Sequence, residues 1–228
     1  MTQAQSSSGD CATRGLWIAV FGPDGVGKSA VIERLQANPC GAFCGSARFH
    51  FRPRFGRGDL GRTPVTRPHA QRPRGLILSI CKLVYWLLDC WFGYLFFVAP
   101  NLRMSRLVIF DRYLPDTAVD PFRYRLPASA MKFAACIARL APRPDLSILL
   151  DAPAETVQQR KREVSPDESH RQRFEYLNMF RSLPASLVTN ADGPIAEVVD
   201  NVTAAIRHFM THSHRQQRPA LVTDAQLD

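Results

Sequence analysis

The stretch Gly22-Pro23-Asp24-Gly25-Val26-Gly27-Lys28-Ser29 reads G-x-x-x-x-G-K-S, and it decides the fold. An apolar run at 16–21 precedes it and fits a buried strand, and helically spaced residues follow at 30–35. A strand, a glycine-rich loop and a helix in this order form a P-loop, in which backbone N–H groups and a helix N-terminus surround a phosphate. A chance glycine turn is the alternative, but the two flanks favour the phosphate site.

The motif predicts the residues that would contact the phosphates of a nucleotide. Lys28 would reach the β- and γ-phosphates, and the Ser29 hydroxyl would bind Mg²⁺. The glycines would let successive N–H groups turn toward the anion. The full set expected to bind the nucleotide is Gly22, Asp24, Gly25, Val26, Gly27, Lys28, Ser29 and Ala30.

The composition is that of a globular protein with a strong positive charge. The chain has 228 residues, 46% of them hydrophobic, and a formal net charge of +9, which fits one domain with one good core. The charge predicts an anionic ligand; a nucleotide, a nucleic acid and an acidic membrane surface all qualify. Arginines gather at 54–74 among prolines and glycines, which predicts a loop that is either solvated or a clamp for an anionic substrate. Aromatic residues do not alternate with these arginines, so we expect no nucleic-acid partner.

An apolar segment at 76–99 is long enough to span a bilayer. Lys82 and Asp89 interrupt it, and a carboxylate is costly in the middle of a membrane. We therefore expect a central core helix, broken or bent near Gly93, with membrane contact as the alternative. Asp89 would be either a buried, paired carboxylate or a group that faces a substrate cleft.

The termini and the cysteines bear on location. Residues 1–14 are small and polar and lack a signal pattern, so we expect a disordered N-terminus, a domain at 15–210 and a disordered tail at 211–228. The six cysteines form no C-x-x-C pair. Reduced thiols in a cytoplasmic protein are the expectation, with a disulfide or a metal at Cys40 and Cys44 as the alternative.

Apolar runs alternate with helical segments along the chain, which predicts a three-layer α/β domain with a five-stranded parallel sheet flanked by helices. Asp111 and Arg112 follow the third strand, and ligands of such sheets bind at the carboxyl ends of strands. These two residues are therefore candidates for the chemistry. A surface ion pair is the alternative reading of them. The expected strands lie at 16–21, 47–52, 106–110, 146–151 and 186–189.

Three motifs in order give the chain a family likeness: Phe-Gly-Pro-Asp-Gly-Val-Gly-Lys-Ser at 21–29, Phe-Asp-Arg-Tyr at 110–113, and Leu-Leu-Asp-Ala-Pro-Ala-Glu at 149–155 before a basic Arg-Lys-Arg at 160–162. With these motifs the chain, over about 16–210, resembles the thymidylate kinase-like branch of the P-loop nucleoside monophosphate kinases. The resemblance implies ATP and Mg²⁺ as cofactors and a nucleoside monophosphate as acceptor. It implies a basic lid at about 160–170, and a homodimer, since family members are often dimers.

The resemblance also assigns roles to single residues. Asp24 would contact the acceptor sugar, unless it only forms a turn. Asp111 would lie near Mg²⁺ and the acceptor phosphate, and Arg112 would hold that phosphate. Arg160 and Arg162 would be lid arginines that neutralise the transferring phosphoryl group, although cations also favour the end of any helix. The loop at 190–193 would pack on adenine.

Two departures from the family pattern concern the acceptor. Only an Arg–Pro fragment at 52–53 remains of the family's Arg-Glu-Pro-Gly-Gly-Thr run, and the Ser and Tyr-Gln positions after Asp-Arg-Tyr are missing. The parts that handle the donor are present, whereas those that read thymine are not. The hypothesis is thus phosphoryl transfer to dTMP or a related nucleotide. A nucleoside or another small alcohol is an alternative acceptor, and a regulatory or assembly protein without kinase activity is an alternative function.

Overall fold

The computed structural model describes residues 14–53, 73–161 and 164–216. The predictions made for 1–13, for most of the arginine-rich loop, for Arg162 and for 217–228 lie outside these residues.

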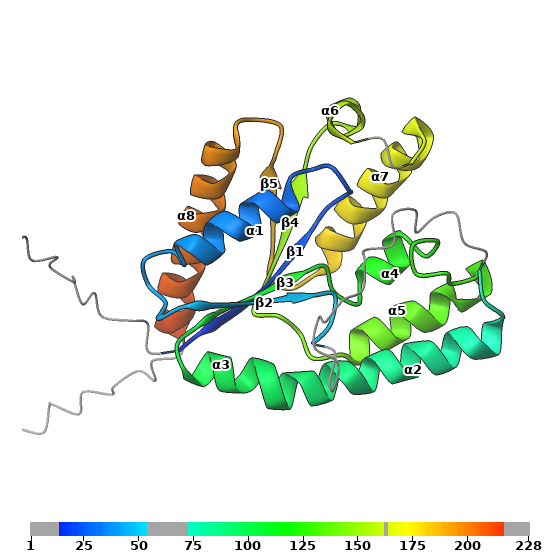
Figure 1. The fold of residues 1–228 in the computed structure, drawn as a ribbon, viewed down its shortest axis with the longest axis horizontal. Helices are drawn as coiled ribbons and strands as arrows, with labels where there is room; N and C mark the ends of the chain where they lie inside the picture. Colours follow the sequence, from blue (N-terminus) through cyan, green and yellow to red (C-terminus); the bar gives the residue numbers. More distant parts are fainter. Residues whose placement is uncertain (1–13, 54–72, 162–163, 217–228) are drawn as a thin grey trace, which may run out of the picture.

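A single five-stranded sheet with the order β2-β3-β1-β4-β5 forms the centre of the molecule, and all its strand pairs are parallel (Figure 1). This confirms the predicted fold class, which is that of P-loop kinases. Parallel neighbours need crossover connections, and helices supply them. The strands are β1 Leu16–Phe21, β2 Ser46–His50, β3 Leu107–Asp111, β4 Leu146–Asp151 and β5 Ser186–Asn190.

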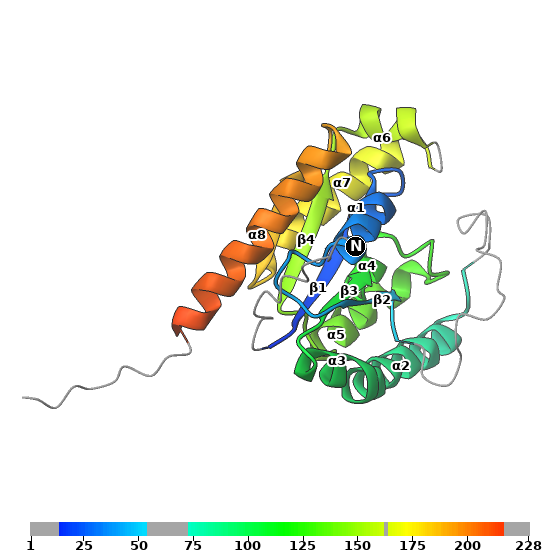
Figure 2. The ribbon, with the colours of Figure 1, turned by 60° about the vertical axis from the view of Figure 1, so that its left-hand side comes forward.

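Helices cover both faces of the sheet, as Figure 2 shows from the side. They are α1 Lys28–Ala37, α2 Leu76–Gly93, the π-helical η2 Tyr94–Val98, α3 Ala99–Arg103, α4 Asp116–Val119, the 3₁₀-helical η3 Ala128–Ala130, α5 Met131–Leu140, α6 Ala154–Arg160, α7 Pro166–Ser182 and α8 Ile195–Gln216.

Successive side chains of β1 divide the core into two parts, because strand side chains alternate between faces. Trp17, Ala19 and Phe21 pack in a cluster with residues of α2, α3, α5 and α7. Ile18 and Val20 pack in a second cluster with residues of α1 and α8. All six side chains of β1 are buried, as expected for a central parallel strand.

Several element boundaries differ from the prediction; β2, for example, is Ser46–His50 instead of 47–52. The expected loop at 163–170 is shorter, because α7 already begins at Pro166: the Ser165 side chain accepts a hydrogen bond from the Glu168 N–H at 3.3 Å and caps the helix. The closing helix α8 continues to Gln216, beyond the expected end at 210. The short helix α4 was not predicted.

The apolar segment forms one long helical rod, α2–η2–α3, with a π-helical stretch that starts directly after Gly93. The predicted irregularity is thus confirmed. The predicted burial is wrong, because only one side of the rod packs in the core: Leu83 is 0% exposed, whereas Ile77 is 76% exposed. Asp89 is buried and forms an ion pair with Arg52, which is the first of its two predicted roles.

One helix of the described residues, Leu76–Arg103, is long and apolar enough to cross a membrane by length and composition. The expectation of reduced thiols also needs a correction: Cys44 is disulfide-bonded, whereas Cys40, Cys81, Cys90 and Cys136 are free. A cytoplasmic location stays a prediction.

The division of the core predicts where a truncation is costly. Ile109 in the centre of β3 is 0% exposed, so Ile109→Ala should lower the free energy of unfolding by about 2–5 kcal/mol. Val188 on the edge strand β5 is 46% exposed, and Val188→Ala should cost under about 1 kcal/mol. Urea unfolding of both variants measures the difference; equal losses would contradict this account of the core.

Candidate active site

The loop between β1 and α1 has the backbone of a phosphate cradle. Gly22, Gly25 and Gly27 all have positive φ angles, of 142°, 90° and 104°, which side chains with a Cβ rarely adopt. A Cβ placed on Gly27 would meet nothing within 4 Å, so the space beside the loop is open there. No side chain caps α1, so the first N–H groups of this helix can donate to an anion. The predicted Ser29 and Ala30 are both exposed in that first turn.

Lys28, the first residue of α1, is buried, and its side chain lies against the P-loop backbone. Its Nζ donates hydrogen bonds to the carbonyl oxygens of Gly22 at 2.8 Å and Pro23 at 2.7 Å, and lies 3.8 Å from Asp24. Burial and the nearby charge of Arg112 lower the pKa of Lys28 to about 7, although neighbouring carboxylates oppose this. Its charge therefore depends on pH in the neutral range.

Arg112 ties several elements together at the carboxyl end of β3. It is 2% exposed and adopts a φ of 69°, an uncommon conformation for a residue with a Cβ. Its Nη1 donates to both carboxylate oxygens of Asp116 in α4, at 3.0 and 2.8 Å, and to the Tyr176 hydroxyl in α7 at 2.9 Å. Burial alone would lower the pKa of Arg112, but Asp116, Tyr176 and Asp24 raise it well above the ordinary value.

Asp24 joins the loop to this network. One of its carboxylate oxygens accepts a hydrogen bond from Arg112 Nη2 at 2.5 Å, and the other accepts one from Arg123. The predicted Asp24 and Arg112 are thus direct partners, although 88 residues separate them in the chain. Arg123 was not predicted, and it places a second guanidinium at the same carboxylate.

Asp111, the last residue of β3, is 5% exposed. Arg48 of β2 donates to its Oδ2 at 2.7 Å, and His50 Nδ1 lies 3.6 Å from the same atom. Burial would raise the pKa of Asp111, but His50, Arg48 and the charge of Lys28 lower it well below its ordinary range. Asp111 is therefore ionised at neutral pH, and one oxygen is already engaged by β2.

A metal ion at this site would depend on few protein ligands. Among the described residues, no group of three or more His, Cys, Asp or Glu side chains is placed to hold a metal. The two predicted metal ligands, Ser29 and Asp111, fit Mg²⁺ in type, because this ion prefers oxygen and usually binds one or two protein groups together with phosphates and water.

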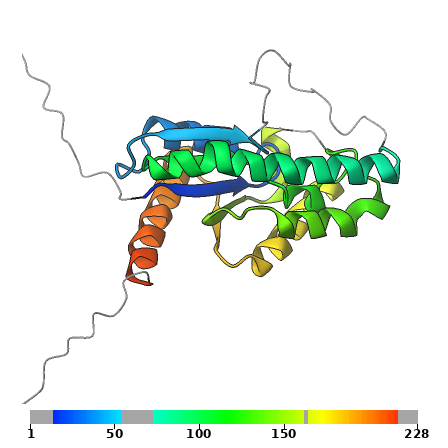
Figure 3. The same cartoon turned by 90° about the horizontal axis from the view of Figure 1, so that it is seen from below.

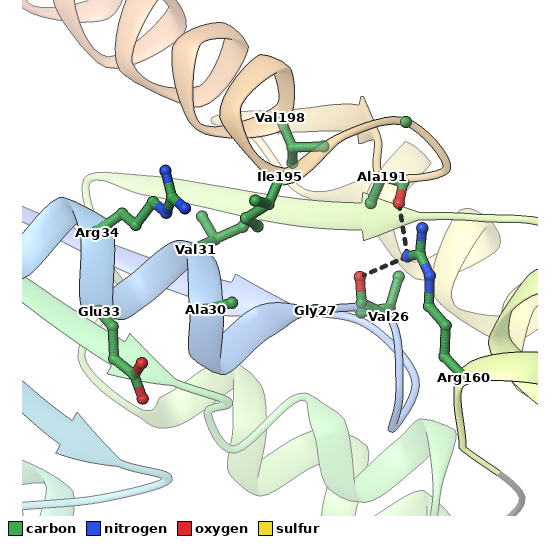
Figure 4. A pocket seen from close by; sticks show the side chains of 11 residues that line it. Val26, Gly27, Ala30, Val31, Glu33, Arg34, Arg160, Ala191, Ile195 and Val198 are labelled. Atoms are coloured by element: carbon green, nitrogen blue, oxygen red, sulfur yellow. Dashed lines mark hydrogen bonds between the residues drawn. The ribbon is translucent and has the colours of Figure 1, made fainter.

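A pocket of about 420 Å³ lies beside the P-loop, between α1, α6 and the start of α8 (Figure 4). Val26, Val31, Ile195 and Val198 give it apolar walls. Ala191 and Gly193, from the loop that the family likeness assigned to adenine, also line it. Its size falls within the range of small-molecule sites.

Arg160 closes one end of this pocket, and its guanidinium also lies 3.5 Å from the carbonyl oxygen of Val26 in the P-loop. Its guanidinium donates to the carbonyl oxygens of Ala191 and Asp192, both at 2.9 Å, as Figure 4 shows for the first contact. In this conformation Arg160 is thus a neighbour of the predicted base site. Arg162, the second predicted lid arginine, lies outside the described residues.

Four groups of this network escaped the sequence analysis: Asp116, Arg123, Tyr124 and Tyr176. They come from α4, α7 and the segment at 123–124, and none belongs to a short motif. The only local signal is the i, i+4 spacing of Arg112 and Asp116. Their role becomes visible only when the fold brings α4 and α7 to the end of β3.

Fold and site together define the class: a parallel α/β domain with a P-loop, a buried arginine at the end of the neighbouring strand and an apolar pocket beside the loop. No family model matches the chain. The chain is 28% identical over 119 residues to a probable thymidylate kinase from Pyrococcus abyssi. This match covers 49% of the chain and 57% of that protein. The distant similarity supports a kinase-like relationship, without fixing a substrate.

The Arg112 network predicts a large effect of a nearly isosteric change. Asp116 is 0% exposed, so Asp116→Asn leaves the Arg112 charge short of a partner and should lower the free energy of unfolding by about 3–5 kcal/mol. The control is Asp200→Asn, at an exposed residue of α8, for which we expect a change within about 0.5 kcal/mol in the free energy of unfolding. Thermal and urea unfolding provide the measurement, and a neutral Asp116→Asn would refute the network's structural role.

Proposed function

We propose that the chain is a Mg²⁺- and ATP-dependent kinase that transfers the γ-phosphoryl group of ATP to a nucleoside monophosphate, dTMP or a related nucleotide. The observation that carries the proposal is the direct link between the P-loop and the end of β3, made by Asp24 and Arg112. This link supports the proposal, because it would put the donor's phosphates and the acceptor next to each other.

In this proposal the donor lies along the P-loop. The open space at Gly27 and the uncapped start of α1 suit its phosphates, and the apolar pocket at Val26, Val31 and Ile195 suits its base. Arg160 would fix the loop at 191–192 against that base. Ser29 and Asp111 would hold Mg²⁺, and the ion would supply positive charge that offsets part of the charge of the donor's phosphates.

The acceptor would lie at the ends of β2 and β3. Arg123 and Arg112 hold Asp24 between them, so an acceptor sugar hydroxyl could share the carboxylate while its phosphate meets a guanidinium. No protein nucleophile is needed. Catalysis would consist of alignment and of charge stabilisation by Lys28 and the arginines, with the α6–α7 segment serving as the lid that excludes water.

Lys28 provides the test of phosphoryl transfer. Lys28→Ala removes a cation of the cradle and should lower kcat at least about 100-fold, with little effect on the melting temperature. Lys132→Ala, at an exposed lysine of α5, is the matched control and should keep full activity. The assay follows radiolabelled phosphate from ATP into a panel of nucleoside monophosphates, nucleosides and other alcohols.

The panel also separates the alternatives. If the radiolabelled phosphate appears in a nucleoside or another alcohol, and in no nucleoside monophosphate, the proposed acceptor is wrong. ATP binding without any labelled product would support a regulatory protein. A fully active Lys28→Ala enzyme would contradict the proposal as a whole.

The lowered pKa of Lys28 predicts how ATP affinity depends on pH. With a pKa of about 7, Lys28 is increasingly neutral in the free protein as the pH rises from 7 to 9, while bound phosphates favour its charged form. Binding must then take up a proton, so the affinity should fall by up to about tenfold per pH unit. Phosphate groups lose their last proton near pH 6, so a pH dependence between pH 7 and 9 comes from the protein and not from the nucleotide. Fluorescent ATP-analogue titrations should show the slope, and Lys28→Ala should abolish it.

A further inference from the structure

We infer that the α2–η2–α3 rod docks the protein on the surface of an anionic lipid bilayer, without crossing it. The inference does not depend on the proposed function. It rests on the exposed apolar face of the rod, on the buried opposite face, and on the charges of the surrounding surface.

The exposed face follows the helical repeat. Figure 3 shows the rod in the foreground, running along one side of the sheet. The main outward apolar side chains are 45–76% exposed. From Tyr85 onward they recur every three or four residues, and Leu78 lies seven residues, or two turns, before Tyr85, so they form one broad stripe. We call this stripe the apolar face; its main residues are Ile77, Leu78, Tyr85, Leu88, Trp91 and Leu95.

The opposite side of the same rod excludes a transmembrane orientation. Leu83, Val98 and Leu102 are at most 5% exposed and belong to the core cluster on this side of the sheet. Asp89 is 4% exposed and paired with Arg52 from the end of β2. A helix with lipid on all sides would have to break these contacts. The rod can instead lie in the interface, with only its apolar face in the lipid.

The charges around the apolar face favour anionic lipid as the occupant. In the described stretch 73–144 all acidic residues are buried: Asp89, Asp111, Asp116 and Asp120. The basic residues of the same stretch include exposed side chains at both ends of the rod. We call these the rim cations: Arg74, Arg103 and Arg106.

The adjoining helix α5 extends the surface. Trp91 of the rod donates its indole N–H to the Leu140 carbonyl oxygen at 3.1 Å, so the two helices meet there. Phe133 and Leu140 on α5 are 46% and 56% exposed. The surface thus combines apolar and aromatic groups with cations, which is typical of proteins that bind membrane surfaces.

The same charges argue against a second copy of the chain as the occupant. A twofold interface opposes one patch to itself. Rim cations would then face rim cations, and no exposed carboxylate of the described stretch 73–144 could compensate them. Anionic headgroups supply the charge that a second copy lacks.

The test is flotation of the full-length protein with lipid vesicles in a density gradient. We expect flotation with vesicles that contain about one third phosphatidylglycerol in phosphatidylcholine, and much less with phosphatidylcholine alone. Raising the salt from about 0.1 M to about 1 M should weaken binding, because it shortens the Debye length from about 10 Å to about 3 Å.

Matched variants locate the contact. Leu88→Asp and Leu95→Asp place a carboxylate on the apolar face and should abolish flotation. Phe174→Asp is the control, since Phe174 on α7 is 62% exposed away from the rod, and it should float like the wild type. Arg74→Gln and Arg103→Gln should each weaken binding about fivefold. Circular dichroism and the melting temperature check that every variant folds.

Three results would overturn the inference. They are wild-type protein that stays at the bottom with anionic vesicles, folded Leu88→Asp and Leu95→Asp variants that still float, and a lipid-independent dimer that Leu88→Asp converts to a monomer. The last result would assign the apolar face to a second copy.

Discussion

The buried guanidinium of Arg112 sets the main constraint on this molecule. A charge so far from water must have partners, since an unpaired buried ion costs several kcal/mol. The chain meets this need with Asp116 from α4, the hydroxyl of Tyr176 from α7, and Asp24 from the P-loop. Four separate segments therefore have to come together before the charge is compensated, and the site is assembled by the same contacts that complete the fold.

This network also explains the chemistry available at the site. Burial and the nearby charge of Arg112 lower the pKa of Lys28 to about 7, although neighbouring carboxylates oppose this, so its charge changes around neutral pH. Asp111 is the opposite case, because His50 and Arg48 keep its carboxylate ionised despite burial. The cation at the start of α1 can thus lose its charge, whereas the anion at the end of β3 keeps it. Such a pair suits a site that must accept a highly charged ligand and then release it.

The local signals of the sequence were sufficient for the scaffold. Short apolar runs placed all five strands, and the G-x-x-x-x-G-K-S loop placed the phosphate cradle, because these features depend on neighbours in the chain. The start of α7 was also readable from Ser165, Pro166 and Glu168, a capping pattern that the sequence analysis overlooked.

Other features could not be read from the chain. The partners of Arg112 lie up to 88 residues away, and Arg160 turns toward carbonyl groups of a distant loop. The predicted burial of the core helix at 76–99 was wrong for a related reason. Hydrophobicity indicates that a segment avoids water, but not whether protein or another medium covers each of its sides. Only the packing of α2 and α3 separates the two sides.

The Arg52–Asp89 ion pair links the end of β2 to the inner side of the rod, while the pocket at Val31 and Ile195 lies on the other face of the sheet, between α1 and α8. The rod and the pocket therefore lie on opposite faces of the sheet. A protein that rests on its rod would keep the pocket beside the P-loop open to bulk solution, and the end of β2 close to the headgroups. A ligand of the pocket would then bind from solution without displacing the rod from the lipid surface.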